Sequence, residues 1–289
     1  MKILLVNKFH YLRGGAERVY FNTKRLLESA GHQVICFSMK DPRNLPSEQE
    51  HYFVDNIDFE NNGDKFKKAA HYFYSAQARE KMEMLLDDEK PDIVHLHNFA
   101  HHLTNSILTP IKKRHIPVVQ TLHDYQWICP NYQLFVAGSV CERCKKHKYF
   151  KAVFHKCLKN SFGKSLLGAM DSYWQWLTQD YKKIDLFLSP SFFLKEKFEQ
   201  FGFQAKVDVL PNFIELENYA PSYESQPYIV FAGRLSPEKG LLQLLSVIKD
   251  LAHIKLKVLG AGPQQGEVSR FLSQNNLENV EILGTKNGP

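Results

Sequence analysis

The chain has 289 residues, of which 44% are hydrophobic and 24% are charged, close to the average of soluble globular proteins. A chain of this length buries a sizeable core without disulfides or metals, which excludes a disordered tail, a fibrous protein and a mini-protein scaffold. Its 37 basic and 31 acidic residues give a net charge of +6, which is too mild by itself to identify a partner.

The N-terminus does not look like a secretion signal. Only four apolar residues, 3–6, follow Lys2, whereas a signal peptide has an apolar stretch of about 7–15 residues. No apolar run approaches the length of about 18 residues that a membrane-spanning helix needs. We therefore expect a cytoplasmic protein, and peripheral binding to the inner face of the membrane stays open.

Short apolar runs alternate with helical patterns through the first 190 residues. A strand over 2–6, a helix over 16–30 and a strand over 33–37 are typical of one βαβ unit. The later patterns predict helices and strands in the same alternation, over 67–89, 93–97, 104–114, 118–122, 185–189 and 207–210. This alternation predicts a doubly wound α/β domain over residues 1–190.

A second α/β unit is expected after a linker region. Residues 191–226 form that region, which becomes rich in proline and polar residues toward its end. The strand and helix alternation then restarts over 227–289, with strands near 228–232, 255–259 and 280–283 and helices near 241–251 and 267–274. Because this part is shorter than a typical domain and stops after a strand, we expect it to be an incomplete domain.

Two glycine-containing loops and one basic loop are candidate anion sites. Gly14 and Gly15 precede a helix, where backbone N–H groups can approach a phosphate; a tight turn is the alternative interpretation. The loop 260–266 is a weak match to a dinucleotide fingerprint, since its third glycine is one place late. Arg234 and Lys239 precede a predicted helix, and two cations there favour a bridging anion over solvated surface charges.

Six of the 13 histidines lie between residues 95 and 123. His95 and His97 point to the same side of a predicted strand, but no carboxylate completes a hydrolase-type metal motif, so we expect neutral histidines that line a cleft. His123 and Asp124 follow a buried strand at its carboxyl end, where α/β sheets place their ligands. His123 is the strongest candidate for a catalytic or substrate-orienting group.

Four cysteines cluster in the sequence, at Cys129, Cys141, Cys144 and Cys157. A cytoplasmic chain disfavours disulfides, so the spacing C-x11-C-x2-C-x12-C raises a structural zinc site. Only one C-x2-C pair is present, and free thiols or a redox pair remain alternatives.

The segment 145–166 is basic and amphipathic. It carries seven lysines and no acidic residue, and its apolar residues recur at helical spacing. Such a helix can lie on an anionic membrane surface or cover the domain core. Nucleic acid is not expected as a partner, because the aromatic residues lie on the apolar stripe and not among the lysines.

The ordered set of motifs resembles family 4 of the retaining glycosyltransferases, whose two Rossmann-like domains face each other in the GT-B arrangement. The matching motifs are Gly14-Gly-Ala-Glu-Arg18, Ile93-Val-His-Leu-His-Asn98, Thr121-Leu-His-Asp124, Ser189-Pro-Ser191, Pro211-Asn212, Phe231-Ala-Gly-Arg-Leu-Ser-Pro-Glu-Lys-Gly240 and Gly260-Ala-Gly-Pro263. The match at 260–263 removes the dinucleotide interpretation of that loop.

The resemblance implies roles for several of these residues. Gly14 and Gly15 would approach the donor, while Arg234 and Lys239 would clamp its diphosphate and neutralise the charge that builds up as it leaves. His123 would face the transferred sugar. His97 and Asp124 would lie on the acceptor side of the same cleft. No cofactor is required for this chemistry, so any zinc at the cysteines would be structural.

Two features depart from the family pattern. No pair of glutamates separated by seven residues follows Gly260, and Phe213 follows Asn212 where many relatives have glycine. The expected function is transfer of a sugar from a nucleotide-sugar donor to a hydroxyl of a glycan or lipid-linked acceptor, with retention, in polysaccharide or glycolipid synthesis. The missing glutamates motivate the alternative of a non-catalytic, truncated binding protein with the same fold.

Overall fold

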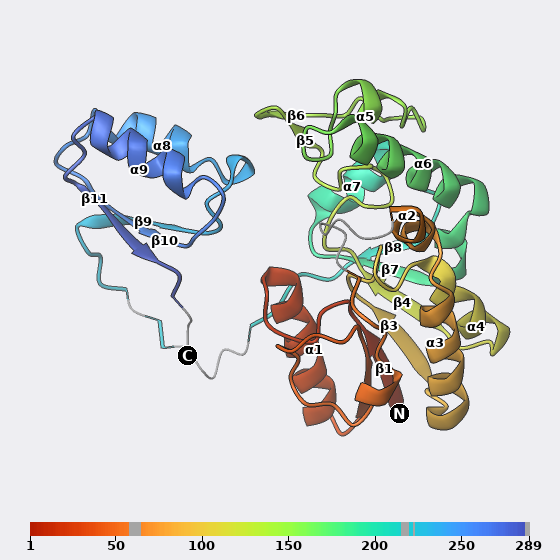
Figure 1. The fold of residues 1–289 in the computed structure, drawn as a ribbon. Helices are drawn as coiled ribbons and strands as arrows, with labels where there is room; N and C mark the ends of the chain where they lie inside the picture. The colour runs from red at the N-terminus through yellow and green to blue at the C-terminus, as the bar shows by residue number, and fades with distance from the viewer. Residues whose placement is uncertain (58–64, 215–219, 222, 287–289) are drawn as a thin grey trace. The chain divides into compact units, whose positions relative to one another are not determined.

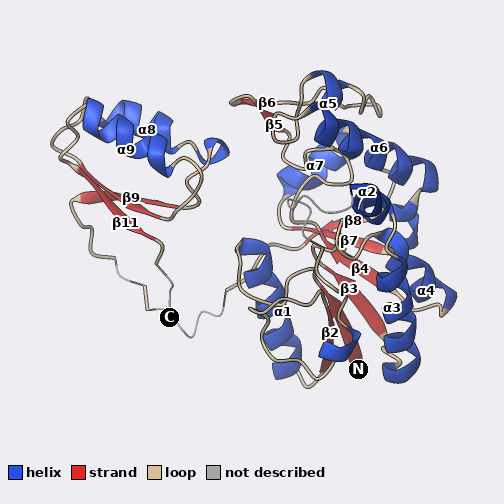
Figure 2. Ribbon diagram, viewed as in Figure 1, coloured by secondary structure: helices blue, strands red, loops and turns tan. Residues whose placement is uncertain are grey.

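The computed structural model describes residues 1–57, 65–214, 220–221 and 223–286. The chain divides into two compact units, one made of residues 1–136 and 140–214 and the other of 137–139 and 215–289. In both units, parallel strands form a sheet against which helices pack (Figures 1 and 2). The α/β class predicted from the alternation of patterns is therefore confirmed.

The first unit is built on a six-stranded parallel sheet with the strand order β2-β1-β3-β4-β7-β8. Its strands are β1 (Lys2–Val6), β2 (Gln33–Phe37), β3 (Ile93–Leu96), β4 (Val118–Thr121), β7 (Leu186–Ser189) and β8 (Val207–Val209). Its helices are α1 (Gly15–Ser29), α2 (Lys65–Phe73), α3 (Ala76–Glu89), α4 (Leu108–Lys113), α5 (Lys151–Phe154), α6 (Phe162–Thr178) and α7 (Phe192–Gln200). A small hairpin pairs β5 (Phe135–Val136) with β6 (Ser139–Val140).

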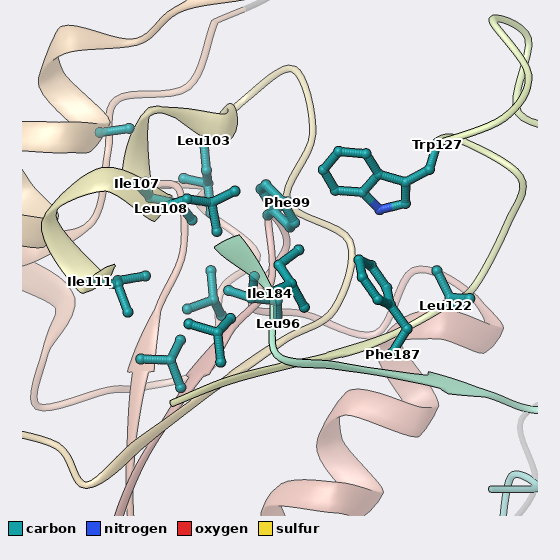
Figure 3. Packing of buried hydrophobic residues seen from close by; sticks show 14 of the residues in the cluster. Leu96, Phe99, Leu103, Ile107, Leu108, Ile111, Leu122, Trp127, Ile184 and Phe187 are labelled. Carbon is teal, nitrogen blue, oxygen red and sulfur yellow. The ribbon is translucent and has the colours of Figure 1, made fainter. Parts of the chain in front are cut away.

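Both faces of this sheet are buried. Leu4 and Val6 of β1 belong to one apolar cluster, while Ile3 and Leu5 of the same strand belong to another. Successive side chains of a strand point to opposite faces, so a central strand covered on both sides has to be apolar throughout. Figure 3 shows the larger cluster near β7, where Phe187 lies beside Trp127.

The long helix predicted over 67–89 is two helices. Ser75 separates α2 from α3, and its hydroxyl accepts a hydrogen bond from the backbone N–H of Ala78 at 3.1 Å. This side chain caps α3, whose first backbone N–H groups have no partner within the helix. The apolar spacing continued across the break, which is why periodicity alone missed it.

The first unit extends beyond residue 190. Helix α7 and strand β8 fall inside the range 191–226 that was expected to connect the domains, yet β8 pairs with β7 in the first sheet. Residues 215–219 and 222 of that range lie outside the described residues.

The second unit has a three-stranded parallel sheet in the order β11-β10-β9. It contains β9 (Tyr228–Ala232), α8 (Leu241–Ile248), β10 (Lys255–Leu259), α9 (Gln265–Gln274) and β11 (Val280–Gly284). Leu241, Leu245 and Ile248 of α8 pack on Leu256 and Val258 of β10, which places the core between the sheet and its helices. Residues 287–289 lie outside the described part of this unit.

The lysine-rich segment is not the continuous helix that its spacing predicts. Helix α5 has only four residues and is followed by a turn in which Lys156, Lys159 and Asn160 have positive φ angles. Helix α6 then begins at Phe162, with Ser161 as its N-cap. Among the described helices, none combines the length and apolar character that crossing a bilayer needs.

Candidate functional site

The strand order of the first sheet reverses between β1 and β3. The chain passes from β1 outward to β2 and returns to place β3 on the other side of β1. In open α/β sheets, ligands bind beyond the carboxyl ends of the strands at such a reversal. Lys8 follows β1, His97 follows β3, and His123 and Asp124 follow β4, so the structure brings these residues to one edge of the sheet.

A hydrogen bond joins His97 to His123, the two histidines expected in the cleft. The distance between His97 Nδ1 and His123 Nε2 is 2.9 Å, and the two rings stack with 5.2 Å between their centroids. His95 lies on the other side of His97, at 4.5 Å between ring centroids, and contacts Thr121 Oγ1 through its Nε2 at 2.8 Å. The three imidazoles thus form a packed row across β3 and β4.

Burial keeps this row of histidines uncharged. Desolvation lowers the pKa of His95 and that of His123 to about 4, and a neighbouring histidine adds to the effect at His123. The pKa of His97, which is fully buried, lies well below its ordinary value for the same reason. At neutral pH these imidazoles are therefore neutral hydrogen-bonding groups, as the sequence predicted.

Lys8, Glu17 and Asp124 form a charged group at the same edge, which the sequence analysis did not identify. Burial lowers the pKa of Lys8, while the carboxylates of Asp124 and Glu17 oppose that shift. Burial raises the pKa of Asp124, against a 2.9 Å hydrogen bond from the backbone N–H of Gln126 and the charge of Lys8. The sequence signal that was available for Lys8 is a charged residue two positions after the first buried strand. No sequence signal indicated that Glu17 is buried.

The protein's own packing requires neither Gly14 nor Gly15. Gly14 has an extended backbone as the N-cap of α1, and a Cβ there would lie 3.6 Å from the carboxylate of Glu17, an ordinary contact. A Cβ on Gly15 would meet no atom within 4 Å. The open space in front of Gly15 fits close approach by a ligand better than the alternative of a turn that only glycine can form.

In the second unit, close backbone approach explains two glycines of the 260–266 loop. A Cβ on Gly260 would lie 1.9 Å from the carbonyl oxygen of Gly233, and one on Gly262 would lie 2.3 Å from that of Leu235. Backbone hydrogen bonds join the two loops, from Leu235 N to Ala261 O at 3.1 Å and from Gln264 N to Leu235 O at 3.0 Å. The 260–266 loop therefore supports the basic loop that precedes it.

Arg234 and Lys239 are both exposed on the supported loop. Arg234 precedes a short 3-10 helix, Pro237–Lys239, whose last residue is Lys239, and Gly240 then turns the chain into α8 through a left-handed conformation. Each of the two cations acts electrostatically on Glu238, and neither takes part in an ion pair within the described residues. Helix α8 begins at Leu241, as the sequence predicts, and both cations before it remain available to an anion.

The four cysteines of the predicted zinc site lie in one region of the first unit. Cys129, Cys144 and Cys157 pack in or against the same apolar cluster. Burial, reinforced by the three other thiols, raises the pKa of Cys144 to about 12. The thiol of Cys129 donates to Asn131 Oδ1 at 2.9 Å, and in the described parts of the chain no three metal-ligating side chains are placed to hold an ion. Zinc binding stays a prediction, and it requires Cys129 to exchange this contact for a metal bond.

Comparison with known proteins identifies the class and then the family. The fold is that of the GT-B glycosyltransferases: sucrose-phosphate synthase of Thermosynechococcus elongatus matches 99% of this chain with a TM-score of 0.66 at 13% identity, and the chain covers 71% of that structure. Anabaena HepE, solved in complex with UDP-glucose, matches 99% of the chain with a TM-score of 0.58 at 16% identity, and 70% of HepE is covered.

The family model of Glycosyltransferase Family 4 matches residues 13–218, and the chain belongs to this family. An uncharacterized 42.6 kDa protein of the Klebsiella pneumoniae cps region is 26% identical over 98% of this chain and 74% of its own length. An uncharacterized glycosyltransferase of Methanocaldococcus jannaschii is 35% identical over 20% of this chain and 16% of its own length.

We expect the first unit to lose stability as the pH falls from 7 to 5. The unfolded histidines have a pKa near 6.5, whereas burial lowers that of His123 to about 4, so the unfolded state binds more protons below pH 6.5. This one group contributes about 3 kcal/mol that is present above pH 6.5 and lost as the pH approaches 4. Urea unfolding between pH 7 and 5 measures the slope, which His123→Asn lowers. Substitution of the exposed His155 by Gln is the control, and an equal slope in all three proteins would contradict the assignment.

The zinc prediction is checked by metal analysis of protein purified under reducing conditions. We expect one zinc ion per chain, lost on Cys144→Ser because a structural site needs its full set of thiolate ligands. Cys36→Ser is the matched control, since Cys36 is a buried cysteine of β2 outside the cluster. Reduced protein without stoichiometric zinc removes the site.

Proposed function

We propose that this glycosyltransferase transfers a sugar from a nucleoside diphosphate sugar to a hydroxyl group of a glycan or lipid-linked acceptor, with retention of configuration. The observation that carries the proposal is the pair of exposed cations, Arg234 and Lys239, on a loop whose backbone is supported by close glycine contacts. A nucleoside diphosphate leaves with additional negative charge, and preorganised cations stabilise that charge where it develops.

Arg234 and Lys239 have different parts in this clamp. The guanidinium of Arg234 offers a planar set of donors that matches two phosphate oxygens at once, and Lys239 adds a compact point charge. Because no ion pair with a described residue occupies either group, binding of the diphosphate does not require breaking one.

His123 orients the transferred sugar through a neutral hydrogen bond. Nε2 of His97 is buried and has no hydrogen-bond partner among the described residues, which disfavours a proton at that nitrogen because buried N–H groups are rarely left unpaired. His97 then carries its proton on Nδ1 and donates it to Nε2 of His123. This leaves Nδ1 of His123 as an N–H donor for a sugar hydroxyl, with His97 as its positioning residue.

For retention in a single displacement, the acceptor hydroxyl attacks from the side from which the diphosphate departs. The open space at Gly15 and the half-buried charges of Lys8 and Asp124 give the edge of the first sheet both room and polarity for an acceptor. The relative from the Klebsiella cps region supports a role in surface polysaccharide synthesis, and HepE supports a uridine diphosphate sugar as the first donor to test.

Replacement of Arg234 by alanine tests the proposed clamp. We expect calorimetry with UDP-glucose and GDP-mannose to detect binding of at least one donor, and Arg234→Ala to weaken it about 10- to 100-fold, because a charge-assisted hydrogen bond contributes about 1.5–3 kcal/mol. Arg270→Ala is the matched control, as Arg270 is an exposed arginine of the same unit on α9. If Arg270→Ala and Arg234→Ala have the same effect, the clamp is misplaced.

Substitution of His123 separates orientation of the sugar from binding of the nucleotide. We expect His123→Ala to lower kcat about 10- to 100-fold while the affinity for free UDP or GDP stays unchanged, because only the sugar contacts the imidazole. His97→Asn should lower kcat less, since it changes only the orientation of His123. The anomeric configuration of the product, read by NMR, reports retention; loss of UDP or GDP affinity on His123→Ala would contradict the assigned role.

A further inference from the structure

Helix α6 exposes an apolar stripe to solvent. Five large apolar side chains lie within about 120° of arc on its surface, given 100° per residue, and between 41% and 68% of each is exposed: Phe162, Leu166, Met170, Trp174 and Leu177. A stripe of this width normally faces the core of a globular protein. Contiguous exposed apolar surface of this kind marks an interaction site.

The buried face of α6 is made of small and polar residues. The residues that it turns inward are Ser165, Gly168, Ala169, Asp171, Ser172 and Gln175. Two of them form a hydrogen bond with each other, in which Gln175 Nε2 donates to Asp171 Oδ2 at 2.6 Å. The amphipathic pattern of the helix is therefore inverted: its polar side lies against the protein and its apolar side lies outward.

Helix α5 continues this apolar surface. It packs against α6, and the backbone N–H of Phe150 donates to Tyr173 Oη at 3.3 Å (Figure 1). The side chains of Phe150 and Phe154 are 46% and 78% exposed. The residues of segment 145–166 that pack in or against the core are Tyr149, Ala152, Val153 and Cys157. Covering the core therefore does not explain the exposed side chains of Phe150 and Phe154.

Lysines surround the start of this surface. Segment 145–164 carries seven lysines and no acidic residue, and Lys156, Lys159 and Lys164, all exposed, lie on the turn before α6 and on its first turn. Aromatic and aliphatic side chains beside several lysines are the composition of segments that lie in the interface of an anionic bilayer. The positive charge of these lysines therefore favours an anionic lipid surface as the partner of the exposed apolar stripe.

We propose that the α5–α6 surface, defined by Phe150, Phe154 and the five stripe residues of α6, docks on an anionic lipid bilayer. Helix α6 lies in the plane of the membrane, its stripe enters the headgroup and acyl boundary, and the lysines contact anionic headgroups. The stripe extends to Leu177, beyond the segment whose sequence suggested a membrane contact. This inference does not rest on sugar transfer, because its evidence lies in exposure and charge alone.

Vesicle co-sedimentation tests the proposal with the chain as it is. We expect the protein to bind vesicles of equimolar phosphatidylcholine and phosphatidylglycerol at least about tenfold more strongly than vesicles of phosphatidylcholine, with binding that weakens as salt is added. Trp174 is a built-in probe, since half of it is exposed in the free protein. Its fluorescence should shift to the blue on binding, and Trp174→Phe should remove most of the shift while sedimentation persists.

Matched variants separate the apolar and the electrostatic contributions. The triple variant L166S/W174S/L177S and the triple variant K156Q/K159Q/K164Q should each lower binding to the anionic vesicles at least about tenfold. The apolar control is L12S/F192S/V247S, which removes three equally exposed side chains elsewhere, and the charge control is K113Q/K182Q/K249Q. Circular dichroism and thermal melting verify that all four remain folded.

Four outcomes would overturn the proposal. Equal binding to neutral and anionic vesicles would remove the role of the lysines, and an equal loss in test and control variants would remove the role of this surface. Absence of vesicle binding, or a dimer that L166S/W174S/L177S converts to monomer, would assign the stripe to a protein contact. None of these measurements uses a sugar nucleotide, so they are independent of the outcome for glycosyl transfer.

Discussion

Burial of the six-stranded sheet on both faces is the constraint on which the site depends. The central strand β1 is apolar on both faces from Ile3 to Val6, so the polar groups that it contributes to the site follow where the strand ends. The reversal of strand order between β1 and β3 then brings the carboxyl ends of β1, β3 and β4 to one edge. Lys8, His97 and His123 share this edge although they are far apart in the sequence.

The same burial sets the chemistry of these groups. Desolvation penalises the charged form, so the imidazoles of His95, His97 and His123 are neutral, and Lys8 is held beside two carboxylates. In the role proposed for His123, a neutral imidazole held by a second imidazole orients a sugar hydroxyl without adding charge. Charge is instead concentrated on the exposed Arg234 and Lys239, which suits the diphosphate end of a donor.

Helix α6 shows the opposite arrangement, with polar side chains inside and apolar side chains outside. Elsewhere in the first unit most large apolar side chains lie inside, whereas α6 turns Ser165 and Gly168 inward and Trp174 and Leu177 outward. A Cβ added to Gly168 would lie 2.9 Å from a methyl group of Leu158, which shows how closely the turn before α6 packs on its inner face. Because small residues pack closely on the inner face of α6, its large apolar side chains stay exposed and can contact a partner.

The sequence by itself determined the α/β class, the position of nearly every strand and the family motifs, because an apolar run bounded by loops is a local pattern that one strand carries alone. It also proposed His97, His123, Arg234 and Lys239 as candidate site residues, since each directly follows a strand or lies in a motif. Only the tertiary structure decided that Ser75 divides a helix, that Lys8 and Glu17 join Asp124, that Gly260 and Gly262 serve loop packing, and that α6 is inverted. Periodicity reports that a helix has an apolar side, but which way that side faces depends on contacts between segments distant in the chain.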